Sequence, residues 1–409
     1  MSAAHRVGVA WRVLRAEGAG AVRDRVRDHL AEAMRRRSYA PMPPGWQPEA
    51  PIPVLGVTDS PPVPWLGGVP SQLRTRLEAE ARGRSTALLY PEGGAWRLEV
   101  RSGAERWFLL EEPAFETAVR RAAERVGARA IHAEGIAGLP LDSLLTLARE
   151  GRMLLLSLHD FSALSPHPHE WPPKERRALA EELLAAADAV IFSSDFLRRS
   201  HAELLPGLAT ERWHVLEPPV ASTVALPRPS PGPLQHVAFV GSVQEHKGAL
   251  VFAETVRRMA GAGIRWSTYG GGDAPRLREL RRLGVRVRGY YRSGALPALL
   301  RRDAVDLALL PSIVPESHSL VLSECVVAGV PVAAFALGAL AERIPHLAAG
   351  RLVPPEQGAG GMVDAVREML RDGPPAVPEE SARHLIDPLS AAAGYLAVYR
   401  ELGLLLLEL

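Results

Sequence analysis

Residues 236–248 read His-Val-Ala-Phe-Val-Gly-Ser-Val-Gln-Glu-His-Lys-Gly, and this stretch decides the fold class. Its first five residues, His236–Val240, form a short and mostly apolar run of the kind that makes a buried strand. Gly241 is a turn signal, and a helical spacing of apolar residues begins after Gly248. A strand, a loop and a helix in this order are typical of a parallel α/β sheet.

The same alternation extends along the chain in both directions. Upstream, strands are expected at residues 54–57, 87–90, 130–132, 153–158 and 189–192, with helices at 69–81, 115–126, 141–148 and 174–187. Downstream, strands at 264–269, 285–288, 307–310 and 330–334 alternate with helices at 249–260, 274–283, 296–302, 320–328 and 362–371. Residues 218–234 contain six prolines and predict a linker. We therefore expect an α/β protein with two Rossmann-like, doubly wound domains that face a central cleft, where the ligand would bind.

The composition excludes several classes of protein. Of the 409 residues, 47% are hydrophobic and 23% are charged, which excludes a disordered chain. The single cysteine, Cys325, excludes a disulfide framework and a cysteine-based zinc site. The net charge of +2 gives no reason to expect a nucleic acid as a partner.

No stretch of the sequence predicts a membrane span. The most apolar one, residues 320–340, contains Glu324 and is interrupted by Pro331, as expected for a buried helix and strand. Arginines interrupt the N-terminal residues, where a secretory signal peptide would need an apolar core. The expected location is therefore the cytoplasm.

The N-terminal segment has the strongest charge bias in the chain. Residues 1–38 contain nine arginines and four acidic residues, with apolar residues at an amphipathic spacing. Two interpretations remain open. The segment is either a solvated helix packed on a domain or a basic helix that lies peripherally on the anionic inner face of a membrane.

Lys247 stands out because the chain contains 46 arginines and only two lysines. A lysine that persists in such a chain indicates a need for a compact charge. Lys247 follows a strand and a glycine and precedes a helix, so its ammonium would lie beside helix-terminal amides, where a phosphate binds well. The alternative is an ordinary surface lysine.

Glu316 and Glu324 form a second candidate constellation. Ser319 is a good N-cap for the helix that follows, so the amides of Leu320 and Val321 would be available to an anion. Glu324 would then lie inside an apolar helix, where an unpaired carboxylate is costly. It needs a partner, which is either a buried arginine or the hydroxyls of a ligand. A purely structural role for the two glutamates is the alternative.

These residues resemble the donor-binding domain of retaining glycosyltransferases of family four, which belong to the glycosyl transferases group 1 and have the GT-B fold. Six matches follow one another within about a hundred residues, which is far more specific than one glycine-rich loop. In order, they are Phe239-Val240-Gly241 with Lys247-Gly248, Tyr269-Gly270-Gly271-Gly272-Asp273, Gly289-Tyr290, residues 306–312, the pair Glu316 and Glu324, and Ala328-Gly329-Val330-Pro331-Val332.

The N-terminal half resembles the same family more weakly. Leu66-Gly67-Gly68-Val69 matches the glycine loop of the acceptor domain, and Leu156-Ser157-Leu158-His159-Asp160 matches a strand that ends in histidine. The resemblance covers roughly residues 54–400 and leaves residues 1–50 outside it.

The resemblance implies a role for each matching residue. Lys247 would neutralise the diphosphate of a nucleoside diphosphate sugar, Glu324 would bind its ribose and Glu316 would hold the transferred sugar. His159 would lie near that sugar, which makes His159, Glu316 and Lys247 the implied catalytic residues. The implied donor-binding residues also include Gly67, Gly68, Gly241, Ser242, Gly271, Ser319, Leu320 and, beside the base, Tyr290.

The implied reaction moves a sugar to a glycan, lipid-linked or small-molecule acceptor with retention of configuration, as in polysaccharide biosynthesis. Fixed positive charge and helix dipoles would stabilise the departing diphosphate, the task that a metal performs in other enzymes. No cluster in the sequence has metal-ligand spacing, so neither a metal nor another cofactor is expected.

One position departs from the family pattern. Ser242 stands where the family usually has arginine, and Arg292 is a candidate to replace that charge. Two alternatives to the transferase therefore remain open: a nucleotide-sugar epimerase on the same fold, and a catalytically degenerate GT-B module that acts in binding or as a scaffold.

The predicted organisation has five parts. A basic amphipathic extension (1–50) precedes the acceptor-side domain (51–220), and a proline-rich linker (221–234) leads to the nucleotide-sugar-binding domain (235–378). The last part (379–409) contains a helix that returns to the N-terminal domain.

Overall fold

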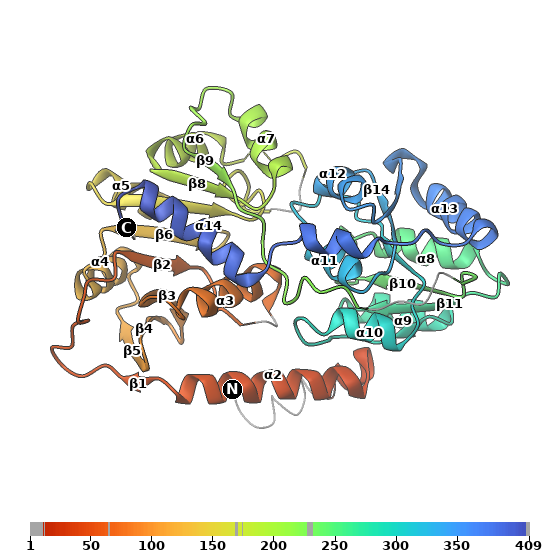
Figure 1. Ribbon diagram of the computed structural model, residues 1–409, viewed down its shortest axis with the longest axis horizontal. Helices are drawn as coiled ribbons and strands as arrows, with labels where there is room; N and C mark the ends of the chain where they lie inside the picture. Colours follow the sequence, from red (N-terminus) through yellow and green to blue (C-terminus); the bar gives the residue numbers. More distant parts are fainter. Residues whose placement is uncertain are drawn as a thin grey trace. The chain divides into compact units, whose positions relative to one another are not determined.

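The computed structural model describes residues 11, 13–63, 66–167, 171–173, 175–226 and 232–405 (Figure 1). The chain divides into two compact α/β units. Unit 1 combines the N-terminal residues up to Ala31 with Val220–Leu385, and unit 2 combines Glu32–Pro219 with the residues from Ile386 onward. The predicted fold class, two Rossmann-like doubly wound domains, is confirmed.

Unit 1 contains a six-stranded sheet in which every neighbouring pair of strands is parallel. In spatial order its strands are β12 (Arg286–Val287), β11 (Arg265–Tyr269), β10 (His236–Val240), β13 (Leu307–Leu310), β14 (Val332–Phe335) and β15 (Gly350–Val353). The chain proceeds outward from β10 in one direction and then from β13 in the other. Ligands of doubly wound sheets bind at the carboxyl ends of the strands where this reversal occurs.

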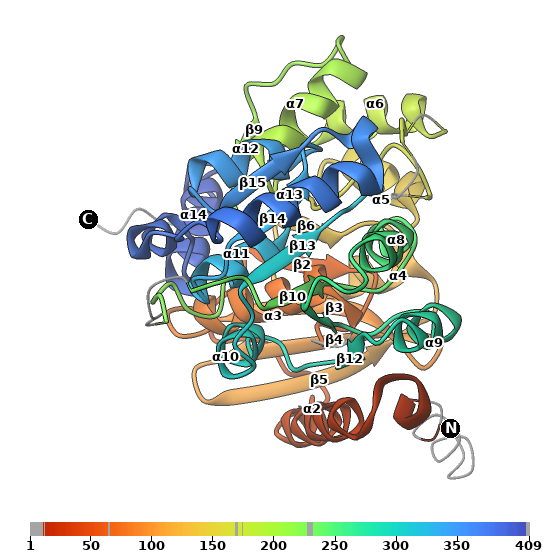
Figure 2. The same ribbon diagram turned by 90° about the vertical axis from the view of Figure 1, so that its right-hand side faces the viewer.

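Helices cover both faces of this sheet because each strand sends alternate side chains to two cores. In β10, Ala238 and Val240 enter one core, and Val237 and Phe239 enter the other. Three helices cover the first core: α10 (Leu296–Arg302), α11 (Leu320–Val327) and α12 (Ala339–His346). The second core is covered by α8 (Ala249–Arg258), α9 (Ala274–Arg282) and α13 (Gly358–Asp372), of which α8 and α13 lie side by side (Figures 1 and 2).

Unit 2 contains a nine-stranded sheet. In spatial order its strands are β1 (Ala40–Pro41), β5 (Glu105–Glu111), β4 (Ala95–Ser102), β3 (Thr86–Glu92), β2 (Val54–Thr58), β6 (Ala130–Gly135), β7 (Met153–Leu158), β8 (Ala189–Phe192) and β9 (Trp213–Val215). The strands from β3 to β9 in this order are parallel, whereas β4 pairs with both β3 and β5 in the antiparallel sense.

The antiparallel strands β4 and β5 are an addition to the predicted parallel sheet. No strand was predicted between residues 91 and 114. The charged residues Arg97 and Glu99 interrupt the apolar residues of β4, so this stretch does not look like a buried strand. In the structure both charged side chains are buried, and Arg97 donates to Glu99 at 2.9 Å. Tyr90 of β3 donates a further hydrogen bond to Glu99 at 2.7 Å. These pairings satisfy the charges and allow the strand to enter the sheet.

The helices of unit 2 also lie on both faces of the sheet. One face is covered by α4 (Phe115–Val126), α5 (Leu141–Arg149), α6 (Arg177–Ala186) and α7 (Asp195–Leu204). The other face is covered by α3 (Gly68–Glu80) and the C-terminal helix α14 (Pro388–Glu401), which contact each other (Figure 1). Two short 3₁₀ helices, η2 (Pro355–Gln357) and η3 (Glu379–His384), belong to unit 1.

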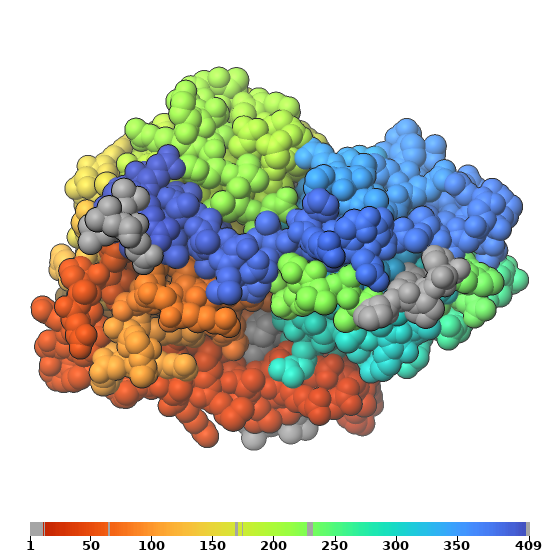
Figure 3. Space-filling view, viewed as in Figure 1, coloured from red at the N-terminus to blue at the C-terminus, as the bar shows by residue number. Residues whose placement is uncertain are grey.

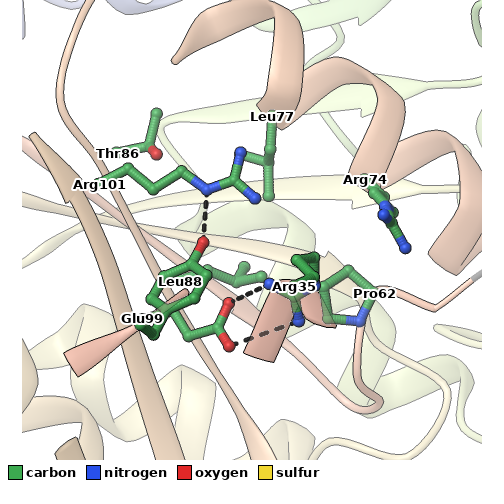
Figure 4. Close-up of a pocket in the computed structure, with 9 residues that line it drawn as sticks. Arg35, Pro62, Arg74, Leu77, Thr86, Leu88, Glu99 and Arg101 are labelled. Atoms are coloured by element: carbon green, nitrogen blue, oxygen red, sulfur yellow. Dashed lines mark hydrogen bonds and ion pairs between the residues drawn. The ribbon is translucent and has the colours of Figure 1, made fainter. Parts of the chain in front are cut away.

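The N-terminal helix α2 (Ala19–Arg37) turns its acidic side chains toward the protein. The boundary between the two units falls inside this helix, so the predicted extension 1–50 does not form a unit of its own. Near its end, Arg35 donates to Glu99 at 2.7 Å (Figure 4). The cavity beside this pair measures about 30 Å³, which is enough for water. Among the described residues, no helix is long and apolar enough to cross a membrane.

A buried network of charges connects α3, β6 and α14 in unit 2. The guanidinium of Arg76 pairs with Glu80 and Glu134, and it lies 3.9 Å from the ring centroid of Tyr395. Burial raises the pKa of Glu134 to about 7, and the positive charge of Arg76 opposes that rise. All three charged side chains are buried, so their charges need compensating partners, which for Glu80 include Arg84 at 2.7 Å as well as Arg76.

We expect Arg76→Met to reduce the free energy of unfolding of unit 2 by about 3–5 kcal/mol, because it leaves Glu134 buried without a cation and leaves Glu80 with Arg84 alone. Arg74→Met is the matched control. Arg74 lies on the same helix and is partly exposed, and its ion pairs with Glu32 and Glu78 should contribute less than about 1 kcal/mol each. Denaturation by urea measures both changes, and equal losses would contradict the proposed importance of Arg76.

Candidate active site

The carboxyl edge of the unit 1 sheet brings together Lys247 and Glu316. Lys247 lies in the loop after β10, and Glu316 lies in the loop between β13 and α11. The Nζ atom of Lys247 donates to Oε1 of Glu316 at 2.7 Å. Both side chains retain some exposure to solvent, so a phosphate or a sugar hydroxyl could reach either one. Two of the three predicted catalytic residues therefore meet in one place.

Gly248 explains how Lys247 comes so close to the loop that follows β13. Its φ of +81° lies in the left-handed region, and a Cβ atom on this residue would lie 1.8 Å from the carbonyl oxygen of Pro311. No side chain fits that space. The close backbone approach also allows Ile313 to donate to the carbonyl of His246 at 3.0 Å, which connects the two loops.

The N-terminus of α11 lies at the same edge. Ser319 caps it as the sequence predicted, since its hydroxyl accepts a hydrogen bond from the Leu322 amide at 3.4 Å. Arg343 of α12 donates to the carbonyls of His318 and Ser319, at 2.9 and 3.1 Å, and thereby fixes the approach to the helix. The amides of the first turn, including that of Leu320, have no acceptor within the helix and can serve an anion.

Glu324 is the most unusual group at this edge. Burial raises the pKa of its carboxyl to about 7. Its carboxylate has no hydrogen bond or ion pair among the described residues, so the buried arginine considered above is not its partner. A partly buried carboxyl without a partner is costly. The remaining candidate partner is a ligand that donates hydrogen bonds, such as a ribose.

Gly241, Ser242 and Gly271 lie together where β10 and β11 end. The Gly241 amide donates to the Tyr269 carbonyl at 2.8 Å, and the Val243 amide donates to the Gly271 carbonyl at 2.8 Å. Ser242 lies between these two contacts. Arg292, the candidate replacement for the missing arginine, instead donates to Asp28 of α2 at 2.8 Å. Arg292 therefore does not supply the missing positive charge beside Ser242.

Tyr290 is contacted by residues that sequence analysis left outside the site. Its amide donates to Glu17 at 2.8 Å, and its hydroxyl donates to Asp28 at 2.5 Å. Burial and the Asp28 carboxylate raise the pKa of the Tyr290 hydroxyl. The only signal of this role in the sequence is that acidic residues occur within an otherwise basic segment.

Unit 2 places Gly67, Gly68 and His159 around one cavity of about 220 Å³. Gly67 is the N-cap residue of α3, so unpaired amides of the first helical turn lie at this cavity. His159 follows β7, and its Nδ1 atom is buried with no hydrogen-bond partner among the described residues. Burial lowers the pKa of His159 to about 4, so the ring is neutral at pH 7.

A second histidine connects this cavity with the core. His132 of β6 makes hydrogen bonds of 2.8 Å to Ser157, which lines the cavity, and to Tyr399 of α14. Burial lowers the pKa of His132 well below its usual range. No role was predicted for His132, because its spacing from the other histidines suggests no catalytic triad. Among the described residues, no three His, Cys, Asp or Glu side chains form a group that could hold a metal ion.

Comparison with known proteins agrees with this arrangement. Residues 235–372 match the family described as Glycosyl transferases group 1. A 209-residue segment is 27% identical to the 2-deoxystreptamine glucosyltransferase of Streptomyces kanamyceticus and covers 49% of this chain. The matching segment spans half the length of that relative.

Solved structures match over most of both units. Sucrose-phosphate synthase from Thermosynechococcus elongatus gives a TM-score of 0.63 at 17% identity, over 86% of this chain and 99% of that one. Anabaena HepE in complex with UDP and glucose gives 0.61 at 16% identity, over 85% and 99% of the two chains. At such identities the similarity concerns the fold.

The two-domain α/β fold is thus that of the GT-B glycosyltransferases. Within that class, the predicted resemblance to the glycosyl transferases group 1 is confirmed by the match over residues 235–372.

We expect Glu324→Gln to stabilise the unliganded protein in a pH-dependent manner. The pKa of Glu324 rises from 4.5 to about 7 on folding, so the ionised form destabilises the folded state increasingly between these values. The substitution should therefore add about 1–3 kcal/mol to the free energy of unfolding at pH 8 and almost nothing at pH 4.5. Urea denaturation at both pH values measures this change in stability. Glu380→Gln, at an exposed glutamate, is the control. An equal effect at both pH values would contradict the assignment.

Proposed function

We propose that this protein is a retaining glycosyltransferase that moves a sugar from a nucleoside diphosphate sugar to an acceptor hydroxyl. The observation that carries the proposal is the Lys247–Glu316 pair together with Glu324, a carboxyl without a partner among the described residues, at the carboxyl edge where doubly wound sheets bind nucleotides. The match to the glycosyl transferases group 1 over the same residues supports it.

Each group at the edge suits one part of the donor. The ammonium of Lys247 and the first-turn amides of α11 would bind the diphosphate, and Glu324 would accept hydrogen bonds from the ribose hydroxyls. Glu316 would then leave Lys247 and accept hydrogen bonds from the sugar. HepE was crystallised with UDP and glucose, so UDP-glucose is the first donor to test.

In the proposed reaction, the bond between the anomeric carbon and the diphosphate oxygen breaks while the acceptor oxygen bonds to the same face of the sugar. The acceptor proton passes to the departing diphosphate. Because negative charge grows on that diphosphate, Lys247 and the helix N-terminus would stabilise the transition state without a metal ion.

The resemblance assigns Gly67, Gly68 and His159 to the donor, and we propose that the acceptor binds in the unit 2 cavity that these residues line. The neutral ring of His159 can donate or accept a hydrogen bond there without carrying charge. The relative from Streptomyces kanamyceticus is named for 2-deoxystreptamine, so small polyhydroxylated molecules should be tested along with lipid-linked and glycan acceptors.

Two other functions make different predictions. An epimerase would change the donor without an acceptor, and a degenerate module would bind a nucleotide without turnover on any acceptor. Ser242 is the feature that motivates the degenerate module. Product analysis with and without acceptor separates all three functions.

We expect Lys247→Ala to weaken UDP binding by about 1.5–3 kcal/mol, the contribution of a hydrogen bond to a charged group. Lys247→Arg should recover only part of this loss, because a planar guanidinium does not replace a compact ammonium. Titration calorimetry measures both. Lys174→Ala, at the only other lysine, is the control, and an unchanged affinity in Lys247→Ala would exclude Lys247 from the donor site.

We also propose that α2 holds the enzyme peripherally at an anionic membrane surface. Val26, Leu30 and Met34, spaced four residues apart along this helix, are 48%, 58% and 66% exposed. Figure 3 shows the atoms of α2, in red, at the surface. Arg23, Arg27 and Arg37 are also exposed on this helix. The acidic residues Asp28 and Glu32 instead face the protein, where they are buried and ion-paired. An apolar stripe with basic neighbours complements anionic lipid headgroups.

Cosedimentation with lipid vesicles tests this contact. The protein should bind vesicles in which about a quarter of the lipids are anionic and should dissociate as salt is added. Leu30→Glu combined with Met34→Glu should reduce binding about tenfold or more, because burial of these side chains supplies the apolar part of the affinity. Leu389→Glu, at an exposed leucine of α14, is the control. Equal binding to neutral vesicles would contradict the proposal.

A further inference from the structure

The N-terminal segment places a carboxylate in the part of unit 1 assigned to the nucleotide base. Glu17 is 7% exposed and lies just before α2. Its two carboxylate oxygens accept hydrogen bonds from Arg25 at 2.9 and 3.2 Å, and Oε2 also accepts the Tyr290 amide at 2.8 Å. A base that approaches Tyr290 could use the same amide as a hydrogen-bond donor to its carbonyl or ring-nitrogen acceptors.

Glu17 also contacts the neighbouring glycine loop. A Cβ atom built on Gly271 would lie 3.1 Å from Glu17 Oε1 and 3.3 Å from the guanidinium of Arg25. The ion pair therefore lies against Tyr290, which the family resemblance places beside the base, and against Gly271, another of the implied donor-binding residues. The Glu17 carboxylate thus covers the Tyr290 amide and the loop at Gly271, which a base would contact.

The fit between the segment and the turn at Gly289 is close. A Cβ atom on Gly289 would lie 2.4 Å from Glu17 Cβ and 3.0 Å from Ala21 Cβ, and the φ of Gly289 is +73°. The hydroxyl and the ring of Tyr290 are contacted by the same segment. Asp28 accepts its hydroxyl at 2.5 Å, and the guanidinium carbon of Arg25 lies 4.6 Å from its ring centroid. The amide, hydroxyl and ring of Tyr290 all contact residues 17–28.

We propose that residues 17–28 form an autoinhibitory contact, in which Glu17 occupies the base end of the donor site until a nucleotide displaces it. This inference rests on the proposed donor site in unit 1. Glu17 ends the short helical stretch 13–17, and Gly18, whose φ is +97°, separates that stretch from α2, so Glu17 can withdraw without unwinding α2. Asp28 holds the helix to Tyr290 and Arg292 in the meantime.

The segment lies outside residues 235–372, which match the glycosyl transferases group 1. A bound nucleotide has to compete with an intramolecular carboxylate that is always present. Only molecules in which Glu17 has left the site can bind the base. The apparent affinity for nucleotide therefore falls as the fraction of molecules with Glu17 in place rises.

Binding of UDP, GDP, ADP and dTDP to the full chain and to Glu17→Ala tests the proposal by titration calorimetry. We expect Glu17→Ala to bind the preferred nucleotide at least about fivefold more tightly, because an alanine cannot accept the Tyr290 amide. Glu49→Ala, at an exposed glutamate in the loop after β1, should leave the affinity unchanged. Unchanged or weaker binding by Glu17→Ala would overturn the proposal. Asp28→Asn, which weakens the hold of the same segment on Tyr290 and Arg292, should also strengthen binding if Glu17→Ala folds poorly.

Hydrogen exchange gives a second readout. The preferred nucleotide should accelerate amide exchange in residues 13–31 of the wild-type chain, and slower exchange there would overturn the proposal by showing that the segment closes over the ligand instead. If no nucleotide binds to the wild type or to either variant, the proposed donor site fails and the inference fails with it. Nucleotide binding that depends on Lys247 but is unaffected by Glu17→Ala would overturn the inference alone.

Discussion

Neighbouring strands of a parallel sheet run in the same direction, so their carboxyl ends meet at one edge. In unit 1 this constraint gathers loops that are far apart in the sequence, and it explains why Lys247 and Glu316, which are separated by 69 residues, form an ion pair. In unit 2 the same constraint brings the Gly67 loop and His159 to one cavity. The chemistry of each unit depends on this edge, and the helices on both faces provide the burial that keeps the strands in register.

The two units differ in whether a key buried charged side chain has a partner. In unit 2, Arg76 is compensated on both sides, and the network it forms connects the helix behind the Gly67 loop with α14. In unit 1, the residues that the structure describes offer Glu324 no such partner. Buried networks that are fully paired fix a structure, whereas an unpaired group is retained at a cost to stability. This contrast is the physical basis for assigning a ligand to the edge of unit 1 and a structural role to Arg76.

The parts of the structure that depend on neighbouring residues in the sequence could be predicted from it. The strand and glycine before Lys247, and the serine that caps α11, follow from composition and spacing alone. The hairpin of β4 and β5 was missed because Arg97 and Glu99 resemble surface residues until their partners are known. Glu17 was missed for a related reason: its contact with Tyr290 spans 273 residues, and no periodicity carries such information. The outer side of α2 was detectable as amphipathic, but which side faces the protein depends on ion pairs that only the tertiary structure supplies.

The scarcity of lysine has a consequence for chemical labelling. Lys247 is one of two lysines in 409 residues, and its side chain is partly exposed at the edge of the sheet. Amine-reactive reagents can therefore modify few positions on this protein, and one of them lies in the proposed donor site. A diphosphate bound at the edge of the sheet would cover the Nζ atom that now contacts Glu316. The rate of acylation at Lys247 would thus report whether the proposed donor site is occupied.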